Sequence, residues 1–345
     1  MDGMTLVTAR LPLLQVDWET LLSVNLPTLL FVVIGVPLVL VGYIVGFDVL
    51  VRRLPKRSQP SVRPWVWVAP AVFFVGLILV YPMIGTIVRS LFDRHGDTFV
   101  GLGNFVRLLT DHGILIVLRN NLLWLLLYPG LVLLFGLLLA VLSDRVKYEK
   151  PVKSLIFMPM AISFVAMAII WQFMYYYRPP DVPQTGTLNA ILVNIFHGQP
   201  ITWIQDSRFN NFALIFIGVW GATGFAMVIL SAALKGIPAE LLEAARVDGA
   251  NERTIFRRII LPLMMPTIVV VGTTMVIFAL KAFDVVYVMT AGNYNTDILA
   301  RRMYSELYNA GNYANASALA VVLLLAVVPV LIFNLRQFRA VEARR

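Results

Sequence analysis

The chain has 345 residues, of which 59% are hydrophobic and 14% are charged, with a net charge of +9. Soluble domains average about 45–50% apolar and about 25% charged residues, so this composition excludes an ordinary soluble protein. Basic residues cluster in short loops between apolar runs, which indicates membrane topology rather than nucleic-acid binding. The chain contains no cysteine, which excludes disulfides, thiol catalysis and Cys-ligated metals.

Seven apolar segments are long enough to cross a bilayer, which predicts an all-α integral membrane protein with seven transmembrane helices. Residues 1–25 precede the first span, and Arg10, Asp17 and Glu19 break the apolar run that a signal peptide needs. Pro129-Gly130 is expected to interrupt the third span. The expected spans are 26–47, 66–89, 122–142, 154–175, 212–234, 263–289 and 316–335.

The distribution of basic residues predicts the orientation of the chain. The loops 51–65, 143–153 and 235–262, together with the tail 336–345, hold 18 of the 28 Lys and Arg residues. By the positive-inside rule these segments and the C-terminus are cytoplasmic, and the N-terminus is outside. The segment 51–65 is expected to be a flexible connector.

The longest well-patterned polar stretch is 235–262, which predicts a short helix, a turn and a second helix. Gly249 can adopt the positive φ of a helix C-cap, and Asn251 can cap the helix that follows. Ala244 and Ala245 make the surface thin enough for a partner's groove to approach the backbone. The pattern alone leaves open an ordinary amphipathic loop between two membrane helices.

The spacing within this stretch resembles the EAA loop of ATP-binding-cassette (ABC) importer permeases. The stretches WVAPAVFFVGLILVYPMIGTIVRSLFD and FVGLGNFVRLL are similar to the start of the MalF-like (carbohydrate uptake type 1) sugar permeases. SLIFMPMAISF and TGFAMVILSAALKGIP are similar to their alpha-glucoside branch. The elements of the EAA match are Glu243-Ala244-Ala245, Gly249 and Leu261-Pro262.

The resemblance covers about residues 65–338 and implies a type I ABC importer permease fold with one extra N-terminal helix. The implied domains are an N-terminal segment with the extra helix and the connector (1–64), a transmembrane domain (65–338) and a basic cytoplasmic tail (339–345). The implied function is that of a permease subunit in a binding-protein-dependent importer of a sugar, such as an alpha-glucoside, trehalose or maltose. The implied location is the cell (inner) membrane, which the chain crosses several times.

The resemblance also implies the partners: a second permease in a heterodimer, an ATPase dimer and an extracytoplasmic sugar-binding protein, all in contact with membrane lipid. The chain has no G-x-x-x-x-G-K-[ST] phosphate loop, so ATP and Mg²⁺ are expected on the ATPase, with no cofactor or metal on this chain. The EAA segment is expected to seat in a groove of the ATPase. Its contact residues would be Glu240, Leu241, Glu243, Ala244, Ala245, Asp248, Gly249 and Ala250.

Candidate substrate-path residues lie on the fifth and sixth spans. Lys281 and Asp284 are spaced i, i+3, so one continuous helix would place them on the same face. Charges at mid-membrane cost at least about 2.5–3.5 kcal/mol and usually pair or line a cavity. The two residues therefore form either a pair that fixes helix packing or a polar patch on the sugar path. Trp220, Thr223 and Phe225 are further candidates, with lipid-facing or packing roles as the alternative.

Two other classes of function were compared with the importer. An ion-coupled secondary transporter would use Lys281 and Asp284 as its coupling pair. A membrane-embedded enzyme would need a convergent catalytic set, which the chain lacks, since Glu243 has no histidine or second carboxylate organised around it. We therefore expect a transport subunit with no catalytic residues.

Overall fold

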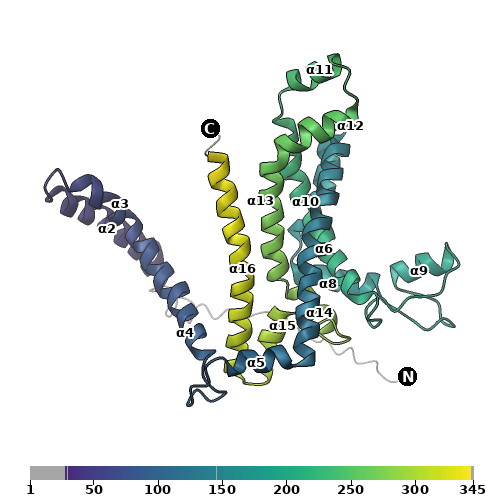
Figure 1. Ribbon diagram of the computed structural model, residues 1–345, viewed down its shortest axis with the longest axis horizontal. Coiled ribbons are helices and arrows are strands. Elements are labelled where there is room, and N and C mark those ends of the chain that lie inside the picture. The colour runs from purple at the N-terminus through teal and green to yellow at the C-terminus, as the bar shows by residue number, and fades with distance from the viewer. Residues whose placement is uncertain (1–27, 29, 145, 343–345) are drawn as a thin grey trace, which may run out of the picture. The chain divides into compact units, whose positions relative to one another are not determined.

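The computed structural model describes residues 28, 30–144 and 146–342. These residues are almost entirely helical, with an isolated antiparallel bridge between Phe92 and Phe99 (Figure 1). The chain divides into two compact units, Met1–Pro82 and Met83–Arg345. The predicted segment 1–25 lies outside the described residues.

The first unit contains a helical hairpin of α2 (Val36–Arg52), preceded by η1 (Phe31–Gly35), and α3 (Gln59–Val75), followed by η2 (Gly76–Val80). Asp48 of α2 joins the two arms, because its carboxylate accepts a hydrogen bond from Arg63 Nη2 of α3 at 3.0 Å, and within α2 it also accepts one from Arg52 Nε at 2.7 Å. The turn between the arms is therefore short. Of the predicted connector 51–65, residues 53–58 lie outside the two helices, and helix resumes at Gln59.

The second unit is a helical bundle with short helices at both ends (Figure 1). Its elements begin with α4, which starts in the first unit. They are α4 (Tyr81–Arg89), α5 (Gly103–Thr110), α6 (His112–Ser143), α7 (Glu149–Phe157), η3 (Met158–Ala161), α8 (Phe164–Met174), α9 (Thr187–Asn194), α10 (Asn210–Lys235), α11 (Ala239–Val247), α12 (Glu252–Ile255), η4 (Phe256–Ile260), α13 (Leu261–Leu280), α14 (Asp284–Thr290), α15 (Leu299–Tyr304), η5 (Ser305–Asn309) and α16 (Tyr313–Glu342).

Within the described residues, five helical runs are long and apolar enough to cross a membrane: Phe31–Arg52, Gln59–Arg89, His112–Ser143, Asn210–Lys235 and Glu252–Leu280. The predicted fourth span is broken, because Glu149–Ala161 and Phe164–Met174 meet at an angle of 102°. This pair makes a sixth span if it is counted as one. The apolar part of α16 described here, Tyr313–Pro329, is shorter than the others.

Two predicted spans differ in continuity from the structure. The third does not break at Pro129, since α6 runs unbroken from His112 to Ser143, and packing against neighbouring helices offsets the cost of an internal proline. The sixth, expected to be continuous over 263–289, ends at Leu280. Phe283 has non-helical torsion angles (φ −143°, ψ −58°), and α14 begins at Asp284. The prediction that Lys281 and Asp284 share one face of a continuous helix is therefore wrong.

The core of the second unit is the contact between α6 and α10. Most of α10 is buried, including Leu214, Ile217 and Met227, each less than 1% exposed. Small residues allow the two helices to approach closely, as is common where membrane helices pack. A Cβ atom placed on Gly136 of α6 would lie 2.6 Å from the Cβ of Ala226 on α10. The position tolerates no side chain unless the helices separate.

We expect Gly136→Ala to lower the free energy of unfolding by about 1–3 kcal/mol, because the added methyl group forces α6 away from α10. Gly130→Ala is the matched control on the same helix, since a Cβ at Gly130 meets no atom within 4 Å. Thermal unfolding of the purified protein in detergent measures both. Equal midpoints for the two variants would contradict the close helix contact.

Candidate functional site

The EAA segment projects from one end of the second unit as a helix and a turn (Figure 1). None of the residues of α11 is buried, and Val247 is 88% exposed. Glu240, Leu241, Glu243, Ala244, Asp248 and Gly249 are exposed, and Ala245 and Ala250 are half-buried. The segment therefore presents its backbone and short side chains to any partner that approaches this end.

The turn after α11 is fixed by its own backbone. Gly249 has φ +81° and donates its N–H to the carbonyl of Arg246 at 3.0 Å, and Ala250 donates to Ala245 at 3.0 Å. This is the Schellman arrangement, which satisfies the last carbonyls of a helix. Asn251 then caps α12 by accepting the N–H of Thr254 at 2.8 Å. The helix, turn and cap predicted from sequence are confirmed.

An ion cluster lies where α10, α7 and the end of α6 meet, next to the start of the EAA segment. Glu149 accepts hydrogen bonds from Lys153 and, at 2.6 Å, from Lys235. Asp144 lies 3.4 Å from the Lys235 ammonium, and Lys153 also contacts Ser231 of α10. The Lys153 side chain is only 16% exposed, so the cluster is partly shielded from solvent. The cluster connects α7, which begins the broken fourth span, to the end of α10.

A cavity of about 250 Å³ lies among α6, α8, α10, α13 and α14. Its lining combines aromatic rings with one cation and one carboxylate. The Trp124 side chain is 2% exposed, and its Nε1 has no hydrogen-bond partner among the described residues. The lining residues are Trp124, Tyr128, Phe164, Gly218, Phe278, Lys281, Ala282, Phe283, Asp284 and Val285.

The cavity contains two of the five predicted substrate-path residues, Lys281 and Asp284. Within the described residues, Lys281 and Asp284 form no ion pair with each other. The other three lie elsewhere. Trp220 packs edge-on against Trp171, with ring centroids 5.7 Å apart, and Thr223 Oγ1 donates to the carbonyl of Val219 at 2.6 Å.

Phe225, the last of the five, packs against the core. Sequence inspection missed the other lining residues, because Trp124 and Tyr128 belong to an apolar span in which nothing marks them as facing a cavity. Their i, i+4 spacing was the available signal, since it places both rings on one face of a helix. In the sequence, Lys153 and Lys235 indicate only the membrane topology of their segments, so their ion cluster was not predicted.

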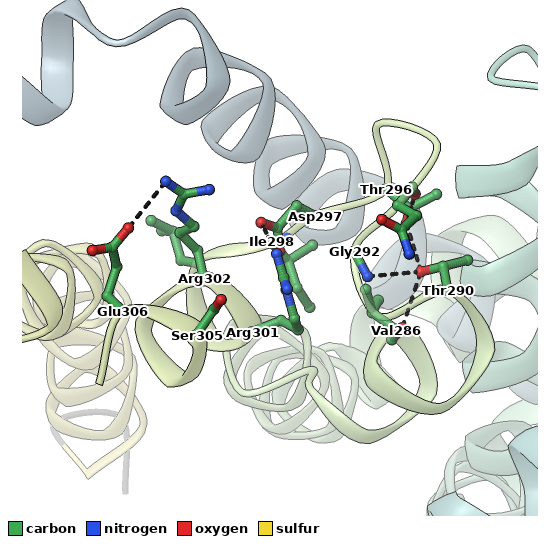
Figure 2. Close-up of polar contacts among 12 residues, drawn as sticks. Val286, Thr290, Gly292, Thr296, Asp297, Ile298, Arg301, Arg302, Ser305 and Glu306 are labelled. Atoms are coloured by element: carbon green, nitrogen blue, oxygen red, sulfur yellow. Dashed lines mark hydrogen bonds and ion pairs between the residues drawn. The ribbon is translucent and has the colours of Figure 1, made fainter. Parts of the chain in front are cut away.

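At the end of the unit opposite α11, a polar network fixes the loop between α14 and α15 (Figure 2). Arg301 Nε donates to Asp297 at 2.7 Å, and Arg302 pairs with Glu306 at 3.0 Å. The Thr290 hydroxyl hydrogen-bonds that of Thr296 at 2.6 Å.

Asparagines of the two core helices support the same loop. Asn120 of α6 donates to the carbonyls of Asn295 at 2.7 Å and Asp297 at 2.9 Å, and Asn210 of α10 donates to Tyr294 at 2.8 Å. Ala291, Tyr294 and Asn295 have positive φ, which the surrounding hydrogen bonds hold in place. The loop is therefore rigidly attached to the α6–α10 core.

Residues 132–344 match the family of binding-protein-dependent transport system inner membrane components. The chain belongs to this family. The expected membership among ABC importer permeases is thereby confirmed, and the chain is a membrane-embedded transport subunit. Together with the sugar permeases among its relatives, the match also bears out the resemblance to MalF-like permeases.

Two relatives share about half of their aligned residues with this chain. The osmoprotective compounds uptake permease protein GgtC of Synechocystis sp. is 50% identical over 280 residues, covering 81% of this chain and 100% of that protein. The alpha-glucoside transport system permease protein AglF of Rhizobium meliloti is 47% identical over 281 residues, covering 81% and 83%. A chain of a solved bacterial ABC transporter that imports alginate has the same fold, with a TM-score of 0.68 and 24% identity over 82% of this chain and 98% of that one.

We expect Glu149→Gln to lower the midpoint of thermal unfolding, because it removes the carboxylate charge with which Lys153 and Lys235 both pair. A double-mutant cycle with Lys235→Met should show favourable coupling between the two side chains. The exposed pair of Arg246 and Glu252, with side chains 52% and 61% exposed, is the control and should give less. Equal coupling energies would show that the cluster stabilises no more than a surface pair.

Proposed function

We propose that this permease passes a compact uncharged glucoside, an alpha-glucoside or a related osmoprotective compound, through the cavity lined by Lys281 and Asp284. The observation that carries the proposal is the chemistry of the cavity wall. A sugar ring has apolar C–H faces and a rim of hydroxyl groups that both donate and accept hydrogen bonds. A matching site needs flat apolar surfaces and a few well-placed polar groups.

The cavity wall provides both kinds of group. Phe164, Phe278 and Phe283 offer accessible ring surface, while Asp284 can accept and Lys281 can donate hydrogen bonds to hydroxyls. The wall carries one positive and one negative side chain, so its charges balance without a charged ligand. This balance favours a neutral ligand.

The relatives support a glucoside as the transported compound. Sugars and osmoprotective compounds are named for GgtC, AglF and the trehalose/maltose permease MalF of Thermococcus litoralis, which is 29% identical over 290 residues. A cavity of about 250 Å³ in this chain favours a small ligand over a long polysaccharide. A second permease would close the remaining side of the site.

The EAA segment is the proposed docking site for the ATPase. Its exposed surface, including Glu243 and the thin Ala244-Ala245 edge, supports seating in a groove of a cytoplasmic ATPase dimer that binds ATP and Mg²⁺. The positive-inside count supports a cytoplasmic location for this end, with the C-terminus on the same side and the N-terminus outside. Seven spans, with the α2 hairpin arm as the extra N-terminal helix, complete the proposed topology.

In the proposed mechanism, closure of the ATPase dimer moves the EAA segment as a rigid body. The ion cluster of Glu149, Lys153 and Lys235 transmits this motion from the end of α10 to α7, which begins the broken fourth span. The bundle then exposes the cavity outward, where an extracytoplasmic binding protein releases its sugar. Hydrolysis restores the inward-facing state. An ion-coupled secondary transporter is disfavoured by the family match, and Lys281 and Asp284 are not paired as a coupling site would suggest.

The substrate proposal is tested by uptake into liposomes that contain the complete complex, using trehalose, maltose and sucrose as probes. Lys281→Met removes one charged hydrogen-bond donor, and Asp284→Asn replaces one carboxylate acceptor oxygen by an amide nitrogen. We expect each to reduce uptake of the transported sugar about tenfold while the complex still assembles, since one lost hydrogen bond costs about 1–2 kcal/mol. Phe225→Leu, outside the cavity, is the control. Unchanged uptake in both cavity variants would refute the site.

The coupling proposal is tested at the Schellman turn. Gly249→Ala forces a Cβ into the left-handed region, which costs about 1–2 kcal/mol, although no atom blocks the space around it. We expect several-fold less ATPase to co-purify, with Gly249→Asn retaining more because asparagine tolerates this region. Gly236→Ala, at φ −76° in the same connection, is the control. Normal ATPase association by Gly249→Ala would exclude the turn from coupling.

A further inference from the structure

Four aromatic rings form a continuous ladder across α14, α15 and η5. Phe283 stacks on Tyr287 with ring centroids 5.1 Å apart and planes at 17°. Tyr304 lies 5.3 Å from both of these rings, and Tyr308 lies 4.7 Å beyond Tyr304. No step in the ladder exceeds the separation at which aromatic rings interact directly.

The ladder connects the surface to the cavity. Tyr308 is 68% exposed and Tyr287 is 42% exposed, while Phe283 at the other end is part of the cavity wall. The helices that carry the ladder lie at the end of the second unit opposite α11 (Figure 1). With the EAA segment in the cytoplasm, the exposed end of the ladder faces the side from which an importer receives its substrate.

The ladder is also held rigidly. Arg301, Arg302 and Glu306, which flank Tyr304 in the sequence, belong to the polar network that fixes the loop between α14 and α15 (Figure 2). Tyr287 lies just before Thr290, whose hydroxyl bonds Thr296 in the same network. A side-chain hydrogen bond with Tyr287 raises the pKa of Tyr304 above its ordinary value. The rings therefore keep their spacing without a ligand.

We propose that the ladder Tyr308–Tyr304–Tyr287–Phe283 is an entry track along which a sugar passes from the extracytoplasmic surface into the cavity. This inference rests on the proposed sugar-import function. Each ring offers a flat face to the C–H surface of a sugar, and the three tyrosine hydroxyls offer hydrogen bonds at its edge. Because neighbouring rings present similar surfaces, a sugar can move from one to the next without losing all its contacts at once.

These rings could serve two other roles. Tyrosines at a membrane interface anchor a helix in the headgroup layer, and aromatic rings also pack at subunit interfaces. Neither role requires the rings to touch one another in sequence or to end at a cavity. The continuity from Tyr308 to Phe283, and from Phe283 to the wall that holds Lys281 and Asp284, is what a sugar path requires.

The track is tested in liposomes with the complete complex, saturating sugar-loaded binding protein and enclosed ATP, recording sugar uptake and ATP hydrolysis together. The probe is whichever of trehalose, maltose and sucrose the wild-type complex takes up fastest. We expect Tyr308→Ala to reduce maximal uptake about three- to tenfold at unchanged ATP hydrolysis. Tyr308→Trp keeps an aromatic ring and should retain uptake. Tyr313→Ala, which removes a 54% exposed tyrosine outside the ladder, is the matched control and should not change uptake.

The outcomes separate the track from the function on which it rests. Uptake by the wild-type complex with no change in Tyr308→Ala would overturn the track and leave sugar import standing. Equal losses in Tyr308→Ala and Tyr313→Ala, or a parallel loss of ATP hydrolysis, would show an anchoring or assembly role and would also overturn the track. If the wild-type complex takes up none of the three sugars while it hydrolyses ATP, both proposals fail.

Discussion

The close approach of α6 and α10 is the constraint on which the rest of the second unit depends. Neither helix could lie so near the other if Gly136 carried a side chain, because Ala226 occupies the space its Cβ would take. In a membrane, helices gain little from hydrophobic association, so such close contact and its van der Waals energy hold the bundle together. The same pair then supports functional elements at both of its ends and in the middle.

At one end, the chain that leaves α6 and the last turn of α10 meet in the ion cluster of Asp144, Glu149 and Lys235. At the other end, Asn120 of α6 and Asn210 of α10 hold the carbonyls of the loop between α14 and α15. Trp124, one turn beyond Asn120, forms part of the cavity wall. The α6–α10 pair therefore connects the ion cluster, the cavity wall and the loop between α14 and α15.

The sequence predicted the parts that depend on local rules. Helix capping and glycine's access to positive φ are properties of a few adjacent residues, so the EAA helix, its Gly249 turn and the Asn251 cap could be derived in advance. The break of the sixth span at Lys281 could not, because its residues continue an apolar run and only tertiary contacts decide where the helix ends. The unbroken passage of α6 through Pro129 has the same origin, since packing overrides a residue that usually interrupts a helix.

The break of the sixth span explains how two charges are tolerated within an apolar segment. On a continuous helix, Lys281 and Asp284 would have to neutralise each other or face a cavity to offset a cost of at least about 2.5–3.5 kcal/mol. Because α13 ends at Leu280, Lys281 follows the last turn of that helix. Asp284 is the first residue of α14, where the positive N-terminal end of the helix dipole stabilises its negative charge. Both side chains then line the cavity, and among the described residues they form no ion pair with each other. The same interruption places Phe283 between them, and it is this ring that joins the cavity to the aromatic ladder.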